Sequence, residues 1–253
     1  IMKILVTGGS GLIGNELKKH LPNAIYPSSS ELNLLNFDNV KSFVSNFKPD
    51  YVVHLAAHVG TLYNNIENQC SYFENNILMN TYLTKICAEN GVYNFLGILS
   101  NCVYSDKLKH FPLLETDIHK GLPHESLLSY GYAKRAHALQ LDNYHKIKKL
   151  NYQYLIPCNV YGIPGNSRKN NLHFLNDLVK KIYIAEKENK TLTLFGDGTP
   201  LRQFMHASDF AKIISLYITN NHCFSCNVSP EENISIENYA KIALKVLNLE
   251  SLR

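Results

Sequence analysis

The stretch Lys3-Ile4-Leu5-Val6-Thr7-Gly8-Gly9-Ser10-Gly11-Leu12-Ile13-Gly14 decides the fold of this chain. Its first five residues are typical of a buried strand, and we expect a helix from Leu12 to His20. Gly8 would allow a tight turn, Gly11 would let the backbone approach a pyrophosphate, and Gly14 would let helix and strand pack closely. The spacing is G-x-x-G-x-x-G. An ordinary turn is the alternative, but the position after a first strand predicts a dinucleotide site.

Strands and helices alternate through the first two thirds of the chain. Further strands are expected near Ala24–Tyr26, Tyr51–Leu55, Asn94–Ser100 and Tyr152–Cys158, and helices near Asp38–Phe47, Ile66–Asn90 and Leu127–Leu150. This βαβ order predicts an α/β protein with a Rossmann-type, doubly wound parallel sheet. We assign residues 1–160 to this dinucleotide-binding domain.

The alternation loosens after Tyr161, where a smaller unit is expected. Its elements are a helix near Leu172–Glu188, a strand at Thr191–Phe195, a helix at Ser208–Ile218, a strand near Phe224–Val228 and a helix at Ser235–Leu247. We predict that residues 161–253 form a C-terminal substrate-binding lobe that also returns elements to the main sheet.

Composition indicates a soluble enzyme. A length of 253 residues and a hydrophobic fraction of 45% suit a globular α/β protein. The net charge of +4 is mild, so no nucleic-acid partner is inferred, although it suits a diphosphate substrate. Neither a membrane span nor a signal peptide is visible, so we expect a cytoplasmic protein. The six cysteines are expected to be reduced thiols, and Cys223-Phe224-Ser225-Cys226 to be core rather than a metal site.

Residues at strand ends carry the candidate chemistry, because ligands bind beyond the carboxyl ends of parallel strands. Ser100-Asn101-Cys102-Val103-Tyr104 follows one strand, and Tyr130-Gly131-Tyr132-Ala133-Lys134 opens the next helix. The four-residue interval places the Tyr130 hydroxyl and the Lys134 ammonium on one helix face. A nearby cation favours phenolate, which would suit Tyr130 for proton transfer.

These features resemble the extended short-chain dehydrogenase/reductase family of nucleotide-sugar enzymes, and within it the GDP-L-fucose synthase type. The resemblance covers essentially the whole chain and extends to Glu31–Leu35, Pro49–Gly60, Ser100–Tyr104, Pro157–Gly162 and Phe195–His206. Its most specific element is the S-x-C-V-Y segment at Ser100. Dehydratases of the superfamily usually carry a Thr followed by acidic residues there, and this chain does not.

The resemblance implies a set of residue roles. Tyr130 would protonate the C4 oxygen as NADPH delivers hydride, Lys134 would hold the cofactor ribose, and Ser100 would bind the same oxygen. Cys102 and His173 would move the protons beside the ketone, so that epimerisation precedes reduction; each also has a plain structural alternative. The cofactor would contact Gly8, Ser10, Gly11, Leu12, Ile13, Gly14, Leu55, Ala56, Ala57, Tyr130 and Lys134, and the substrate Asn159, Lys181 and Arg202.

The chain departs from the family pattern at three places. Ser10 and Ser28-Ser29-Ser30 stand where relatives often carry arginines for the adenosine 2′-phosphate, so NADPH is favoured but NADH stays open. The loop Ile163-Pro164-Gly165-Asn166 differs from the usual sugar-contacting run. The chain also ends at Arg253, short of the usual family length, so the last elements of the lobe are expected to lie outside it.

Several functions stay open at this stage. The first is NADPH-dependent epimerisation and 4-keto reduction of a GDP-4-keto-6-deoxy sugar. Alternatives are a GDP-heptose reductase-epimerase, an NAD-retaining nucleotide-sugar 4-epimerase and a non-catalytic dinucleotide-binding protein. No metal is expected. The family also implies a homodimer through the helices Ile66–Asn90 and Leu127–Leu150.

Overall fold

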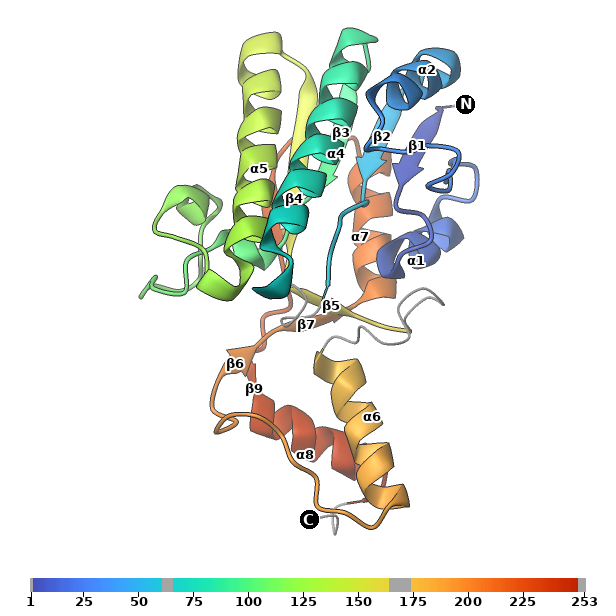
Figure 1. Ribbon diagram of the computed structural model, residues 1–253. Coiled ribbons are helices and arrows are strands. Elements are labelled where there is room, and N and C mark those ends of the chain that lie inside the picture. Colours follow the sequence, from blue (N-terminus) through green and yellow to red (C-terminus); the bar gives the residue numbers. More distant parts are fainter. Residues whose placement is uncertain (1, 61–65, 164–173, 250–253) are drawn as a thin grey trace.

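A five-stranded parallel sheet forms the centre of the molecule (Figure 1). The computed structural model describes residues 2–60, 66–163 and 174–249. The strand order is β1-β2-β3-β4-β8, with bounds β1 Ile4–Thr7, β2 Tyr51–His54, β3 Asn94–Ile98, β4 Asn151–Pro157 and β8 Cys226–Val228. This confirms the predicted Rossmann-type fold.

Alternate side chains of these strands enter two different cores, as the two-residue period of a strand requires. In β1, Leu5 packs toward one face while Ile4 and Val6 pack toward the other. In β2, Val52 and Val53 divide in the same way. Because both faces are covered, the strands read as continuous apolar runs.

Helices cover both faces of the sheet (Figure 1). The helices on one face are α2 (Phe37–Phe47), α4 (Gln69–Glu89) and α5 (Leu128–Lys148). The other face carries α1 (Leu12–His20) and α7 (Ala207–Thr219), which pack against each other. Short 3-10 helices follow β3: η1 (Asn101–Val103), η2 (Glu115–His119) and η3 (Glu125–Leu127).

A smaller unit lies beyond the carboxyl end of the sheet (Figure 1). Its elements are β5 (Asn159–Tyr161), α6 (Phe174–Lys187), β6 (Leu201–Arg202), β7 (Phe204–His206), β9 (Ile234–Ser235) and α8 (Ile236–Val246). β5 pairs with β7 in parallel, and β6 pairs with β9 in antiparallel fashion. Two elements from beyond residue 160 join the larger unit. β8 is a strand of the main sheet, and α7 covers one face of that sheet. The domain boundary at residue 160 stays a prediction.

Two expected strands differ in the structure. Of Ala24–Tyr26, only Ile25 pairs with the sheet, through a bridge to Leu5; Pro27 follows at once and has no N–H for a ladder. The expected strand Thr191–Phe195 pairs with no strand in the described part of the chain. Leu192 and Leu194 instead pack against the small core between α6 and α8, so their alternation reflects contact with helices.

Candidate active site

The glycine loop after β1 has the geometry that a dinucleotide cradle needs. Gly8 has φ +74°, and a Cβ there would lie 2.7 Å from the Ala56 nitrogen, so the turn brings two predicted cofactor segments together. A Cβ on Gly14 would lie 2.5 Å from the Gly8 oxygen. Both positions therefore require glycine, as the sequence predicted.

The N-terminus of α1 is suited to an anion. Gly11 is its N-cap, no side chain caps it, and its first turn holds no acidic residue. Apart from its chain neighbours, a Cβ on Gly11 would have only the Gly8 oxygen within 4 Å among the described residues, at 3.2 Å. Backbone N–H groups at such an end favour phosphate. The first turn contains Leu12 and Ile13, and Ser10 is exposed beside it, so these residues fit the pyrophosphate of a dinucleotide.

A buried hydrogen-bond relay holds the end of β2, where Leu55, Ala56 and Ala57 lie partly exposed. The Ala56 N–H donates to Thr7 Oγ1 (3.3 Å), which lies 2.7 Å from His54 Nδ1. His54 Nε2 lies 3.0 Å from Asn80 Oδ1 on α4. Burial, followed by the Lys134 charge, lowers the pKa of His54 to about 3, so the ring is neutral. The relay therefore fixes the Ala56 amide from within the core.

A second asparagine of α4 holds the next residue of the loop. The His58 N–H donates to Asn76 Oδ1 (3.0 Å), and Asn76 Nδ2 returns a bond to the His58 oxygen (2.9 Å). The His58 ring stacks on Tyr72 at 4.4 Å. Sequence reasoning missed His54, Asn76 and Asn80 as supports of this segment. Polar residues at buried positions of α4, four apart, were the available signal.

Lys134 lies at the base of the predicted catalytic group. It is 2% exposed, and its Nζ donates to the Ile98 oxygen at the end of β3 (2.7 Å). The ammonium lies 5.8 Å from the Tyr130 ring centroid, and Tyr130 itself is partly buried near the start of α5. Burial lowers the pKa of Lys134 to about 8, with Cys102 opposing the shift. The predicted pair therefore shares one face of α5.

Ser100 and Cys102 lie in the turn that follows β3. Ser100 Oγ caps η1 by accepting a bond from the Cys102 N–H (3.3 Å). Cys102 is partly exposed; burial raises the pKa of its thiol, while the Ser100 hydrogen bond and the Lys134 charge act in the opposite direction. Helix α5 packs against η1. The structure thus brings Ser100, Cys102, Tyr130 and Lys134 to the same end of the sheet.

The remaining predicted residues are less closely tied to this group. His173 lies outside the described residues. Asn159 donates through Nδ2 to the Gln203 oxygen (3.1 Å) and so links β5 to the start of β7. Lys181 pairs with Asp177 (3.0 Å) and lies 5.0 Å from the Phe195 ring centroid. Arg202 is exposed and donates to the Leu201 oxygen (2.8 Å).

One of the serines expected near the 2′-phosphate, Ser28, is hydrogen-bonded to a carboxylate. The Ser28 hydroxyl and N–H both lie 2.7 Å from Glu31 Oε2, and Ser28 Oγ lies 2.9 Å from Ser30 Oγ. A phosphate at this place would therefore compete with Glu31 for the Ser28 donors.

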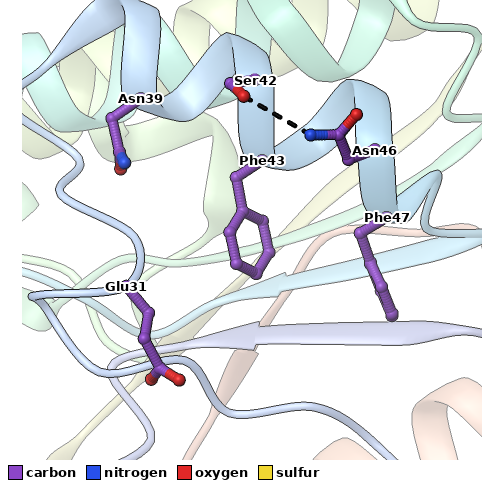
Figure 2. Close-up of a pocket in the computed structure, with 6 residues that line it drawn as sticks. All are labelled: Glu31, Asn39, Ser42, Phe43, Asn46 and Phe47. Carbon is purple, nitrogen blue, oxygen red and sulfur yellow. Dashed lines mark hydrogen bonds between the residues drawn. The ribbon is translucent and has the colours of Figure 1, made fainter.

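A surface hollow of about 460 Å³ lies apart from the predicted catalytic residues, beneath α2 (Figure 2). It is lined by Glu31, Asn39, Ser42, Phe43, Asn46 and Phe47. In the described part of the chain, no three His, Cys, Asp or Glu side chains gather closely enough to hold a metal ion. All six cysteines are free thiols, but the expected core position of Cys223 is wrong, because Cys223 is exposed, while Cys226 is partly buried. Among the described helices, none combines the length and apolar character required to cross a membrane.

Known proteins resemble this chain over nearly its whole length. GDP-L-fucose synthase from Dictyostelium discoideum is 33% identical over 257 aligned residues, covering 98% of this chain and 80% of the relative. GDP-L-colitose synthase from Yersinia pseudotuberculosis is 31% identical, covering 97% and 82%. The crystal structure of a GDP-L-fucose synthetase from Naegleria fowleri bound to NADP has a TM-score of 0.85 at 28% identity, covering 98% of this chain and 78% of that one.

The fold, the glycine loop and a match to a family model together assign this chain to a family. The model of the NAD dependent epimerase/dehydratase family matches residues 4–225, which include strands β1 to β4 of the central sheet and every described member of the predicted catalytic group. This chain therefore belongs to the NAD dependent epimerase/dehydratase family.

Proposed function

We propose that this protein epimerises a GDP-4-keto-6-deoxy sugar and then reduces its C4 ketone with NADPH, as a GDP-L-fucose synthase does. One observation carries the proposal: a fully buried lysine lies on the same helix face as Tyr130, next to the turn that bears Ser100 and Cys102. That set unites the groups of a ketone reductase with a thiol suited to proton transfer. The names of the relatives supply the substrate class.

In the reduction, Tyr130 would donate its hydroxyl proton to the C4 oxygen of the sugar. The Ser100 hydroxyl would hydrogen-bond the same oxygen and so stabilise its developing negative charge. The α1 N-terminus and the Ala56 segment would hold NADPH, which when bound would supply the hydride for C4. Lys134 would hold the cofactor ribose, and its positive charge would stabilise negative charge at Tyr130.

In the epimerisation, Cys102 and His173 would move protons at the carbons beside the ketone. The C4 carbonyl makes those protons removable, so this step must come before the ketone is reduced. Because burial raises the pKa of Cys102, the thiol form prevails at neutral pH. Cys102 would therefore act either as a proton donor or, through its small thiolate fraction, as a base.

In the substrate lobe, Arg202 and Lys181 would contact the diphosphate, and Asn159 the sugar. An exposed arginine fork suits phosphate oxygens. The short distance between Lys181 and the Phe195 ring gives this part of the lobe a cation beside an exposed aromatic face.

The test is incubation with GDP-4-keto-6-deoxymannose and NADPH. The proposal expects loss of NADPH and formation of GDP-L-fucose. No turnover would contradict the substrate assignment. Turnover only with a GDP-4-keto-heptose would show that the protein is a GDP-heptose reductase-epimerase instead. Retention of a bound NAD without net oxidation would favour a 4-epimerase.

We also propose a cytoplasmic homodimer. The outer faces of α4 and α5 expose large apolar side chains, among them Phe73, Leu78, Tyr132 and Leu139, and such patches on neighbouring helices are typical of interfaces. Free cysteines suit a reducing compartment. Light scattering should give twice the chain mass, and Leu139→Glu should halve it; a wild-type monomer would contradict the dimer.

A further inference from the structure

Arg135 is a buried cation whose position stability alone does not explain. The residue is 6% exposed. Within the described residues no carboxylate pairs with it, and its NH2 nitrogen is buried without a hydrogen-bond partner. Burying a charge without a counter-ion is costly. Two hydrogen bonds to backbone carbonyls and the Tyr132 ring, whose centroid lies 5.6 Å from the guanidinium carbon, offset part of that cost.

The guanidinium binds two backbone carbonyls beside the predicted active site. Nε donates to the Val103 oxygen and NH1 to the Gly121 oxygen, each at 2.7 Å. Val103 is the last residue of η1, directly after Cys102. Arg135 therefore connects the end of the Cys102 turn to α5, and it holds the backbone at Gly121 close to that turn.

Its neighbour Lys134 binds the other end of the same segment, because its Nζ donates to the Ile98 oxygen. Between these two anchors, Gly131 lets α5 approach the turn closely. A Cβ there would lie 2.7 Å from the Cys102 oxygen and 2.8 Å from Pro123 Cβ. The turn from Ile98 to Val103 is thus held at both ends by adjacent cations of one helix.

The two ends differ in how much they depend on α5. Ile98 is also held by the ladder between β3 and β4, so Ser100 stays close to a rigid strand. Cys102 lies in a three-residue 3-10 helix, whose hydrogen bonds are few. Loss of the Val103 anchor would therefore move Cys102 more than Ser100.

From these contacts we infer that Arg135 is a positioning residue that holds Cys102 for epimerisation. This inference rests on the proposed function. Misplacing a reacting group by about 1 Å can cost roughly a hundredfold in rate. Removal of the guanidinium therefore impairs proton exchange beside the ketone more than it impairs hydride transfer.

The experiment compares Arg135→Gln and Arg135→Lys with Leu141→Ala, a fully buried position on the same helix that lies away from the turn. Solvent deuterium exchange into the 4-keto substrate is measured beside NADPH oxidation with the already epimerised ketone. Arg135→Gln should lower exchange about tenfold or more and hydride transfer less than about threefold. Arg135→Lys should lie between, since lysine reaches one carbonyl at a time. Leu141→Ala should lower both rates by the same factor, because each rate is proportional to the fraction of folded protein.

A second readout does not depend on the substrate. Peptide mass spectrometry measures the rate at which iodoacetamide alkylates each cysteine. The rate at Cys102 should change several-fold in Arg135→Gln, whereas the rate at Cys158 should stay constant. Equal effects of Arg135→Gln on exchange and hydride transfer, or unchanged Cys102 alkylation, would overturn the inference. If the wild-type protein neither exchanges nor reduces, the proposed function fails, and the alkylation result alone decides whether Arg135 holds the turn.

Discussion

The carboxyl edge of the sheet and the smaller unit beyond it each carry a lysine that we predict to contact a ligand, but they hold it in different ways. Lys134 is 2% exposed and donates to the Ile98 oxygen in the core. The Lys181 side chain is 34% exposed and pairs with Asp177 on the same helix. The first charge is held by a buried backbone carbonyl, whereas the second is held by a carboxylate at the surface. We therefore expect the chemical step at the sheet edge and substrate contact in the smaller unit.

The packing around the two regions agrees with this difference. The sheet edge is supported by two large buried cores, one on each face. In the lobe, the cluster between α6 and α8 contains only Leu178, Ile182 and Ala240 as buried residues in the part of the chain described. Substitutions at the sheet edge should therefore affect the chemical step, and those in the lobe should affect substrate binding.

The largest effect is expected at Tyr130. Tyr130→Phe removes the proton donor, so hydride transfer should fall by about 10²–10⁴-fold, the range for a general acid. Cofactor affinity should change little. Stopped-flow NADPH oxidation gives the first quantity and fluorescence titration the second. A rate within threefold of wild type would mean that Tyr130 takes no part in the reaction.

The buried His54 should make the sheet edge sensitive to acid. Its folded pKa of about 3 lies below the ordinary value of 6.5, so the unfolded chain binds more protons in this window and stability falls as the pH drops below 6.5. Between pH 7 and pH 5 this one group should cost about 2 kcal/mol. Urea unfolding at both pH values measures the loss.

The matched variant is His54→Gln, which cannot take up the proton. Its stability should decline less over the same pH interval than that of the wild-type protein. Parallel decline of the two proteins would show that His54 does not govern the acid response. His137 is also buried, and burial lowers its pKa. It should therefore contribute a further loss of stability at acid pH, both in the wild-type protein and in His54→Gln.

Lys134 should impose an alkaline limit on cofactor binding. The ammonium of the free protein loses its proton as the pH rises through about 8, so a contact between this charge and the anionic cofactor would be present at pH 7 and lost above 8. If only the protonated form binds, NADPH affinity should fall about tenfold from pH 7 to pH 9. Isothermal titration at the two pH values checks this, and equal affinities would remove Lys134 from the cofactor site.

The smallest effect is expected in the lobe. Lys181→Ala removes one partly exposed charge, for which a contribution of about 1 kcal/mol corresponds to a roughly fivefold rise in KM with kcat unchanged. Lys180→Ala is the control, since Lys180 is an exposed neighbour on the same helix. If Lys181→Ala lowered kcat as strongly as Tyr130→Phe does, the division between chemistry and binding would be wrong.

Much of the structure at the sheet edge could be predicted from the sequence, because it depends on short stretches of the chain. The bounds of α1 follow from the glycine loop, and the positive φ of Gly8 from the tight turn. The Tyr130–Lys134 pair follows from helix geometry. These features depend on residues that lie close together in the chain.

The parts that escaped prediction depend on distant contacts. Arg135 looks like a surface residue beside Lys134, and only the approach of Val103 and Gly121 makes it a buried anchor. The relay from Ala56 through Thr7 and His54 to Asn80 joins residues from three elements. Leu192 and Leu194 have the period of a strand but face two helices.

The proposed order of the two steps is tested most directly by one reaction with NADPH and GDP-4-keto-6-deoxymannose in D2O, with the product analysed by NMR. We expect GDP-L-fucose that carries solvent deuterium at C3 and C5, the carbons beside C4, and protium from NADPH at C4. That pattern requires proton exchange first and hydride transfer second at one site. A reduced product without deuterium at C3 and C5, or a deuterated substrate with no loss of NADPH, would contradict it.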